Sequence, residues 1–68
     1  MMKLLLNGQE VEISEDNLTI SKLLQHYDIS EKIAIVEQNE QVVSKEKYSQ
    51  QPIVDGDRIE IVHFVGGG

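Results

Sequence analysis

The residues whose type and spacing most clearly suggest a chemical role are three consecutive glycines, Gly66, Gly67 and Gly68. They directly follow a hydrophobic stretch. Glycine has the most backbone freedom to lose on ordering, so such a segment packs poorly against a core. Because it has no Cβ atoms, it also fits a slot too narrow for other residues and leaves the carbonyl of Gly68 unhindered. On the glycines alone, a passive terminus is the simpler interpretation. Their position directly after the last predicted strand favours an arm that is inserted into a partner protein, with the Gly68 carboxylate as the reacting group.

The chemistry open to such a carboxylate is activation by a partner enzyme. A carboxylate is negatively charged near neutral pH and is a poor electrophile. Adenylation with ATP would convert it to a mixed anhydride, and a sulfur nucleophile would then displace AMP to leave a thiocarboxylate. These steps require only that the C-terminal segment reaches the partner's active site and ends in an exposed carboxylate. They require no catalytic side chain of this protein. A passive glycine tail on a small domain is the alternative interpretation.

Size and composition argue against a self-sufficient enzyme. The chain has 68 residues, enough for one domain with a thin margin of stability and little room for a deep substrate pocket. It has no cysteine, which removes disulfides, thiolate nucleophiles and cysteine-based metal sites. A net charge of −6 disfavours nucleic acid and anionic membranes and favours a basic protein surface as partner. We therefore expect a carrier or interaction module and no enzyme.

The other side chains that could take part in chemistry are explained more simply by structural roles. His26 and His63 are the two histidines of the chain, and we expect no metal site from them. His26 lies near a predicted helix C-terminus, where the helix dipole favours a cation, and His63 lies in a predicted strand. Asp55 and Asp57 could be imagined as an acid–base pair. Because they flank Gly56, they are more typical of a turn.

The first half of the chain predicts a hairpin followed by a helix. Residues 3–6 and 10–13 have strand-like patterns and are joined by Asn7-Gly8, a pair typical of a type I′ turn. A polar break then precedes a helix expected from about residue 19 to residue 28. Its apolar stripe has the spacing i, i+3, i+4 and i+7, and we expect all four members in the core: Ile20, Leu23, Leu24 and Tyr27.

The second half predicts three strands, at residues 33–36, 41–43 and 58–65. The first is a continuous apolar run, the pattern of a buried central strand, and Asn39-Glu40 forms the turn after it. The polar segment before Pro52 has room for one helical turn, and its Tyr48 could face the core or the solvent. One helix across one face of a mixed sheet satisfies every apolar stripe with two layers, an α+β architecture. We expect this domain at residues 1–65 and a flexible tail at 66–68.

The last strand supplies a candidate docking surface beside the tail. Alternation along the strand places Ile59 and Ile61 on one face, and Val62 and Phe64 on the other. If the two isoleucines lie beneath the helix, Val62 and Phe64 form an exposed apolar patch next to the glycines. A bulge near His63 that turns Phe64 inward is the alternative.

Five segments spread over nearly the whole chain carry a resemblance to a known family. They are residues 6–9, 19–24, 33–39, 55–62 and 64–68. On this combination the sequence resembles the ThiS family, sulfur carriers of thiamin biosynthesis within the ubiquitin-like β-grasp superfamily. The resemblance implies a mixed sheet of four to five strands with one main helix packed across one face. The chain departs from the family at Glu40, Ser44-Lys45 and Tyr48, where glycine, Pro-Arg and tryptophan are common.

The resemblance also implies partners. An E1-like adenylyltransferase of the ThiF type would use ATP to activate Gly68, and a cysteine desulfurase or sulfurtransferase would supply sulfur. The Gly68 thiocarboxylate would then donate sulfur to a thiazole synthase of the ThiG type. Gly67, Gly66, Val65 and Phe64 would form the segment that enters partner sites, and no cofactor would be bound permanently. The apolar start is too short for a signal peptide or a membrane span, so a cytoplasmic protein is expected.

Three other functions share parts of this pattern. A molybdopterin-pathway sulfur carrier would use the same activation, although the short length and the Val-Gly-Gly-Gly ending favour the thiamin pathway. A ubiquitin-like protein modifier would form an isopeptide bond between Gly68 and a lysine of its target. A plain interaction domain would be indifferent to the loss of Gly67 and Gly68.

Overall fold

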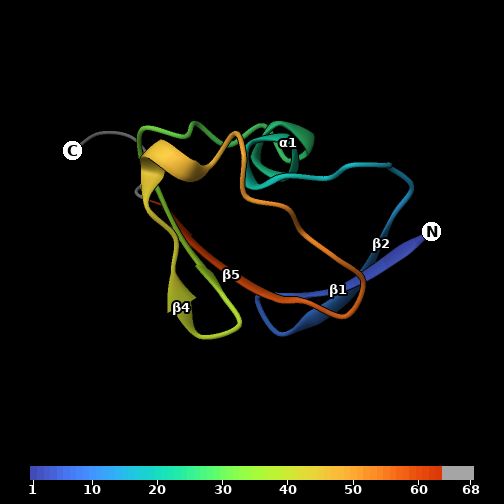
Figure 1. Ribbon diagram of the computed structural model, residues 1–68. Helices are drawn as coiled ribbons and strands as arrows, with labels where there is room; N and C mark the ends of the chain where they lie inside the picture. Colours follow the sequence, from blue (N-terminus) through green and yellow to red (C-terminus); the bar gives the residue numbers. More distant parts are fainter. Residues whose placement is uncertain (64–68) are drawn as a thin grey trace.

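Residues 1–63 are described by a computed structural model and fold into one mixed sheet with a helix on one side (Figure 1). In chain order the elements are β1 (Met2–Leu6), β2 (Gln9–Ile13), α1 (Ile20–His26), β3 (Ala34–Gln38), β4 (Gln41–Val42), the 3₁₀ helix η1 (Lys45–Lys47) and β5 (Arg58–His63). The strands lie side by side in the order β2-β1-β5-β3-β4. β1 and β5 are parallel, and the other neighbours are antiparallel. The predicted α+β architecture is confirmed.

Two tight turns close the hairpins. Asn7 and Gly8 have φ values of 48° and 83°, the left-handed geometry of the predicted type I′ turn, and place Leu6 opposite Gln9. Asn39 and Glu40 adopt the same geometry between β3 and β4, with φ values of 52° and 71°. Glu40 therefore keeps the backbone conformation for which glycine is better suited, at a strain of roughly 1 kcal/mol.

Helix α1 begins with a side-chain cap. Thr19 has extended backbone angles, and its Oγ1 accepts a hydrogen bond from the Lys22 amide at 3.2 Å, which satisfies one of the free N–H groups of the first turn. The helix buries Ile20, Leu23 and Leu24 completely against the sheet. These three members of the predicted stripe are confirmed.

The aromatic side chain in the core is Tyr48 and not Tyr27. Tyr27 is 39% exposed, so its predicted place in the core is wrong: the helix ends at His26, and Tyr27 is already the C-cap residue. Tyr48 follows η1, is 1% exposed, and donates its hydroxyl hydrogen to the Ala34 carbonyl at 2.9 Å. Burial raises the pKa of the Tyr48 hydroxyl.

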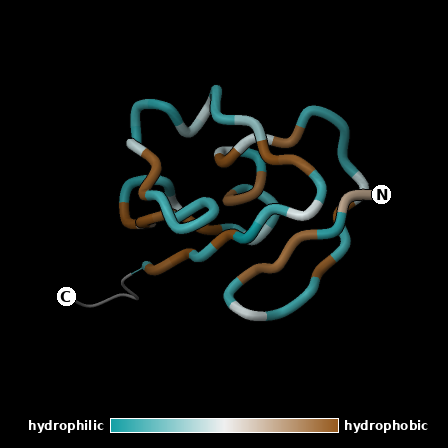
Figure 2. The backbone as a smooth tube through the Cα atoms, turned by 60° about the horizontal axis from the view of Figure 1, so that its bottom comes forward, coloured by the Kyte–Doolittle hydropathy of each residue, from teal (hydrophilic) through white to brown (hydrophobic). Residues whose placement is uncertain are grey.

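The core lies between α1 and the side of the sheet that faces it. Figure 2 shows that hydrophobic stretches of the chain alternate with hydrophilic ones. The buried apolar residues come from every part of the fold: Leu4, Ile13, Leu18, Ile20, Leu23, Leu24, Ala34, Val36, Tyr48, Ile53, Ile59 and Ile61. Within residues 1–63, the members of this core lie between Leu4 and Ile61.

Strand β3 is buried on one face only. Ala34 and Val36 are fully buried, whereas Ile35 is 44% exposed, and Ile33, just before the strand, is 41% exposed. The predicted buried central strand is therefore an interior strand of the sheet, but it is buried on one face only. The physical reason is that α1 covers one side of the sheet, and within residues 1–63 no second layer covers the other. We call this second side the outer face.

Candidate functional site

The predicted reactive segment lies outside the described residues. This holds for Phe64, Val65, Gly66, Gly67 and Gly68, and also for the predicted domain boundary after residue 65. The structure shows instead how the chain reaches this segment. β5 leads to it from the centre of the sheet, with β1 on one side and β3 on the other.

The end of β5 is held on both sides, by a strand and by one side chain. β3 pairs with it as far as His63, but β1 runs beside it only as far as Ile59. Beyond that point Asn7 takes over: its Oδ1 accepts from the Ile61 amide at 2.7 Å, and its Nδ2 donates to the Ile61 carbonyl at 3.3 Å. Asn7 therefore forms the turn of the first hairpin. Its side-chain amide also makes the two hydrogen bonds to β5 that the backbone of a longer β1 would otherwise make. Sequence reasoning identified only the turn.

Replacing Asn7 by glycine should weaken the end of β5 selectively. Glycine keeps the positive φ of the turn, but both bonds to Ile61 are lost, and we expect a loss of roughly 1–3 kcal/mol in the free energy of unfolding. Urea unfolding measures the loss, and hydrogen exchange at the Ile61 amide locates it. Asn17→Gly is the matched control, because Asn17 also has a positive φ of 56° and is exposed. Unchanged protection of the Ile61 amide would contradict this role.

The loop before β5 is ordered by two aspartates. Asp55 Oδ1 accepts from the Lys3 amide at 2.7 Å. Asp57 is 7% exposed, and its carboxylate accepts from Gln38 Nε2 at 2.8 Å, Asn39 Nδ2 at 3.0 Å and the Val54 amide at 3.0 Å. Both residues therefore act as turn formers, as predicted.

The hydrogen bonds also set the acidity of Asp57. Burial raises the pKa of the Asp57 carboxyl, but the bonds from Asn39, Val54 and Gln38 outweigh burial and hold this pKa below its ordinary value of 3.8. A carboxyl with a lowered folded-state pKa stabilises the fold above its unfolded-state pKa. The stabilisation is lost as the pH falls through the folded-state pKa.

Asp57→Asn should therefore reduce stability near neutral pH and flatten its acid dependence. We expect a loss of roughly 1–3 kcal/mol at neutral pH, because a charged acceptor of three hydrogen bonds is replaced by an amide. Urea unfolding at neutral and acidic pH measures both effects. Asp55→Asn keeps one acceptor oxygen and serves as the control. If the stability of Asp57→Asn fell in acid as steeply as that of the wild type, the assignment to Asp57 would be wrong.

The outer face carries the described part of the predicted docking surface. Ile59 and Ile61 are buried beneath the helix, and Val62 is 57% exposed on the opposite side, as predicted. The strand register places Ile35 of β3 directly opposite Val62. Val42, on the edge strand β4, is 68% exposed on the same face. We call Ile35, Val42 and Val62 the outer apolar patch; the sequence pattern had identified only Val62 among them.

The described part of the chain has neither a cluster of metal-binding side chains nor a membrane-spanning helix. Residues 1–63 contain no group of three or more His, Cys, Asp or Glu side chains arranged to hold a metal ion. His26 lies in α1 and His63 at the end of β5. No helix in residues 1–63 is long and apolar enough to cross a membrane.

Comparison with known proteins gives consistent matches. The model of the ThiS family matches residues 4–68. Sulfur carrier protein ThiS of Bacillus subtilis is 49% identical over 63 residues, covering 93% of this chain and 96% of that protein. Thiazole synthase of Paramagnetospirillum magneticum is 40% identical over 67 residues, which are 98% of this chain but 20% of the synthase.

A solved structure extends the likeness to the fold. The crystal structure of the thiamine biosynthesis protein ThiS from Geobacter metallireducens has a TM-score of 0.83 at 29% identity, and the match covers 98% of this chain and 100% of that one. This likeness and the five-stranded mixed sheet with one helix confirm the β-grasp fold. Because the family model matches all but the first three residues, the chain belongs to the ThiS family.

Proposed function

We propose that this protein is a sulfur carrier of thiamin biosynthesis that works through the carboxylate of Gly68. The observation that carries the proposal is the family match over residues 4–68, which includes the glycine tail. The 49% identity with a protein named as a sulfur carrier supports it. The position of β5 supports it as well, because a strand held on both sides provides a rigid base for a tail that must reach into a partner.

In this proposal the partners carry out the chemistry. A ThiF-type adenylyltransferase uses ATP to join AMP to the Gly68 carboxylate, with loss of pyrophosphate. The terminal sulfur of a persulfide on a cysteine desulfurase or a sulfurtransferase then attacks the acyl adenylate and displaces AMP, which gives an acyl disulfide. A thiol reduces this disulfide by attacking the donor's sulfur, so the tail ends in a thiocarboxylate and the donor sulfur leaves in a mixed disulfide with that thiol. Gly66 and Gly67 pass through the narrow entrance of the partner site because they have no Cβ atoms. Val65 and Phe64 enter behind them.

The acceptor of the sulfur is a thiazole synthase of the ThiG type. The thiazole synthase of Paramagnetospirillum magneticum includes a region 40% identical to this chain, so carrier-like and synthase sequences occur in one polypeptide there. Proteins joined in one chain commonly act together, which supports contact between the separate proteins here. Val62 on the outer face, together with Phe64, is the proposed contact surface beside the tail.

The test is an intact mass measurement. The protein is co-produced with a ThiF-type adenylyltransferase in thiamin-starved cells that contain the sulfur donor. We expect a species in which one sulfur replaces one oxygen, with the change confined to the C-terminal peptide. An unmodified mass in the presence of an active adenylyltransferase would refute the carrier function. Conjugates of this protein with lysine residues of other proteins would instead indicate a protein modifier.

A further inference from the structure

Two carboxylates face each other across the outer face of the sheet. The register of β3 and β5 pairs Glu37 directly with Glu60, and both are exposed. Side chains at directly opposite positions of an antiparallel pair have Cβ atoms about 5 Å apart, where like charges destabilise the sheet. The pair therefore reduces the stability of the free protein, and its presence calls for an explanation.

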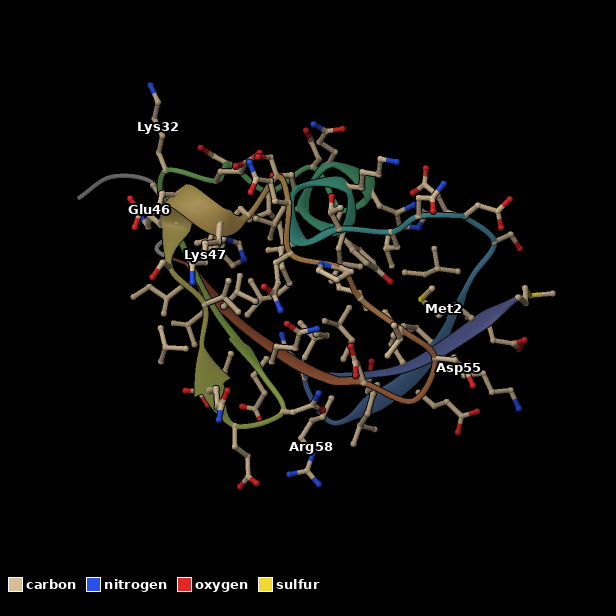
Figure 3. The ribbon with its side chains drawn as sticks, viewed as in Figure 1. Met2, Lys32, Glu46, Lys47, Asp55 and Arg58 are labelled. Atoms are coloured by element: carbon tan, nitrogen blue, oxygen red, sulfur yellow. The ribbon has the colours of Figure 1, made fainter. Side chains whose placement is uncertain are left out.

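No cation of the described chain neutralises this pair. The one ion pair within residues 1–63 joins Lys3 of β1 and Glu10 of β2 at 3.7 Å, toward the β2 edge of the sheet and away from β3. Arg58 lies two residues before Glu60 on the same strand, and Figure 3 shows its side chain directed away from the protein. The pair is thus an uncompensated negative site in a protein whose net charge is −6.

The acidic pair lies within the outer apolar patch. Val42 is directly opposite Glu37 on β4, and Ile35 and Val62 form the next outward-facing pair along β3 and β5. Their exposures of 68%, 44% and 57% leave apolar side chains open to a partner on two sides of the pair. A partner that covered these side chains would also exclude water from the carboxylates, which strengthens their attraction to a cation.

We propose that the Glu37–Glu60 pair and the outer apolar patch form the docking site for thiazole synthase, and that the pair receives an arginine side chain of that enzyme. The inference rests on the proposed function for the identity of the partner. Charge complementarity carries the rest: a guanidinium is planar, presents five donors and can bond to two carboxylates at once. Its weak hydration also suits a site flanked by apolar groups. Docking then relieves the repulsion between Glu37 and Glu60.

The proposal predicts opposite effects on stability and on binding. Glu60→Gln removes one charge and keeps the size of the side chain, so we expect the melting temperature of the free protein to rise by about 2–6 °C. The dissociation constant for the cognate thiazole synthase should increase about tenfold. Glu37→Gln should behave in the same way. Thermal unfolding and titration calorimetry with purified synthase at moderate salt measure the two quantities.

Glu12→Gln is the matched control. Glu12 is exposed on the outer face of β2, and the register places Lys3 opposite it, so its loss removes the same charge without relieving repulsion. We expect no rise in melting temperature and a change of less than about twofold in the dissociation constant. A pair that served only solubility would give equal binding by all three variants and the wild type.

The outcomes separate this inference from the proposed function. If Glu37→Gln and Glu60→Gln bind the synthase as tightly as the wild type does, the docking site is overturned and the carrier function stays intact. Binding weakened equally in Glu12→Gln also overturns it, because the effect is then one of net charge. Failure of the wild type to bind the synthase, together with failure to acquire sulfur, overturns the proposed function itself.

Discussion

Deletion of Gly68 is expected to abolish sulfur loading while the fold stays intact. The shortened chain still ends in a glycine carboxylate, but its reach falls by one residue, about 3.5 Å in extended backbone. A displacement of that size is large for a reacting atom, since misplacement by about 1 Å can already reduce a rate by a factor of about 100. Within residues 1–63 the buried core extends from residue 4 to residue 61. Because Gly68 has no side chain that could be buried, the melting temperature should stay within about 1 °C of the wild-type value.

Intact mass after co-production with the adenylyltransferase measures loading, and thermal unfolding monitors the fold. Gly67→Ala provides a graded comparison, because it keeps the reach and adds only a methyl group to the threading segment. We expect Gly67→Ala to load slowly and the deletion not to load. A deletion variant that acquired sulfur at the wild-type rate would rule out Gly68 as the modified residue.

Leu23→Ala should have the largest effect on stability. Leu23 is fully buried where α1 meets the sheet, and its truncation leaves a cavity in a small core. The expected loss is roughly 2–5 kcal/mol. A domain of this size has a total stability of roughly 3–10 kcal/mol, so the variant should melt at least about 10 °C below the wild type. Thermal unfolding followed by circular dichroism measures the change.

Leu5→Ala is the control for this variant, because the same side chain is lost from a site that is 38% exposed. It should cost less than about 1 kcal/mol. Below its melting temperature Leu23→Ala should still acquire sulfur, since its tail is unchanged. Loading and stability thus respond to different residues. Equal melting temperatures for Leu5→Ala and Leu23→Ala would disprove the packing of α1 described above.

The local features of the fold follow from the sequence because short-range chemistry determines them. Asn7-Gly8 tolerates positive φ at both positions, which selects the hairpin turn. The period-two pattern of β5 places Ile59 and Ile61 inside and Val62 outside without knowledge of the neighbouring strands. Such features require only the residues on either side of them.

The errors arise where the outcome depends on distant parts of the chain. Periodicity placed Tyr27 in the core, but a stripe predicts burial only while the helix continues, and α1 ends before it. The burial of Tyr48 depends on a hydrogen bond to Ala34 on another element. The apolar run around Ile35 is typical of strands covered on both faces, yet coverage depends on how many layers the whole chain can form.

The candidate site divides in the same way. The prediction that the glycine tail reacts needs only residue types and the position of the glycines after the last predicted strand, and the family model includes the tail in its match. The contact of Asn7 with Ile61 joins residues 54 positions apart. The opposition of Glu37 and Glu60 depends on the register of two strands from separate parts of the chain. Neither can be derived before the sheet order is known.

The place of β5 in the sheet has a consequence for synthesis on the ribosome. The β1–β2 and β3–β4 hairpins are local and can form early, but in the sheet they meet only through β5, the last strand described. A nascent chain that has not yet released residues 58–63 therefore exposes one unpaired edge on β1 and another on β3. Open edges of this kind promote pairing between chains. Vectorial synthesis thus delays the completed sheet until the strand that carries the tail has emerged.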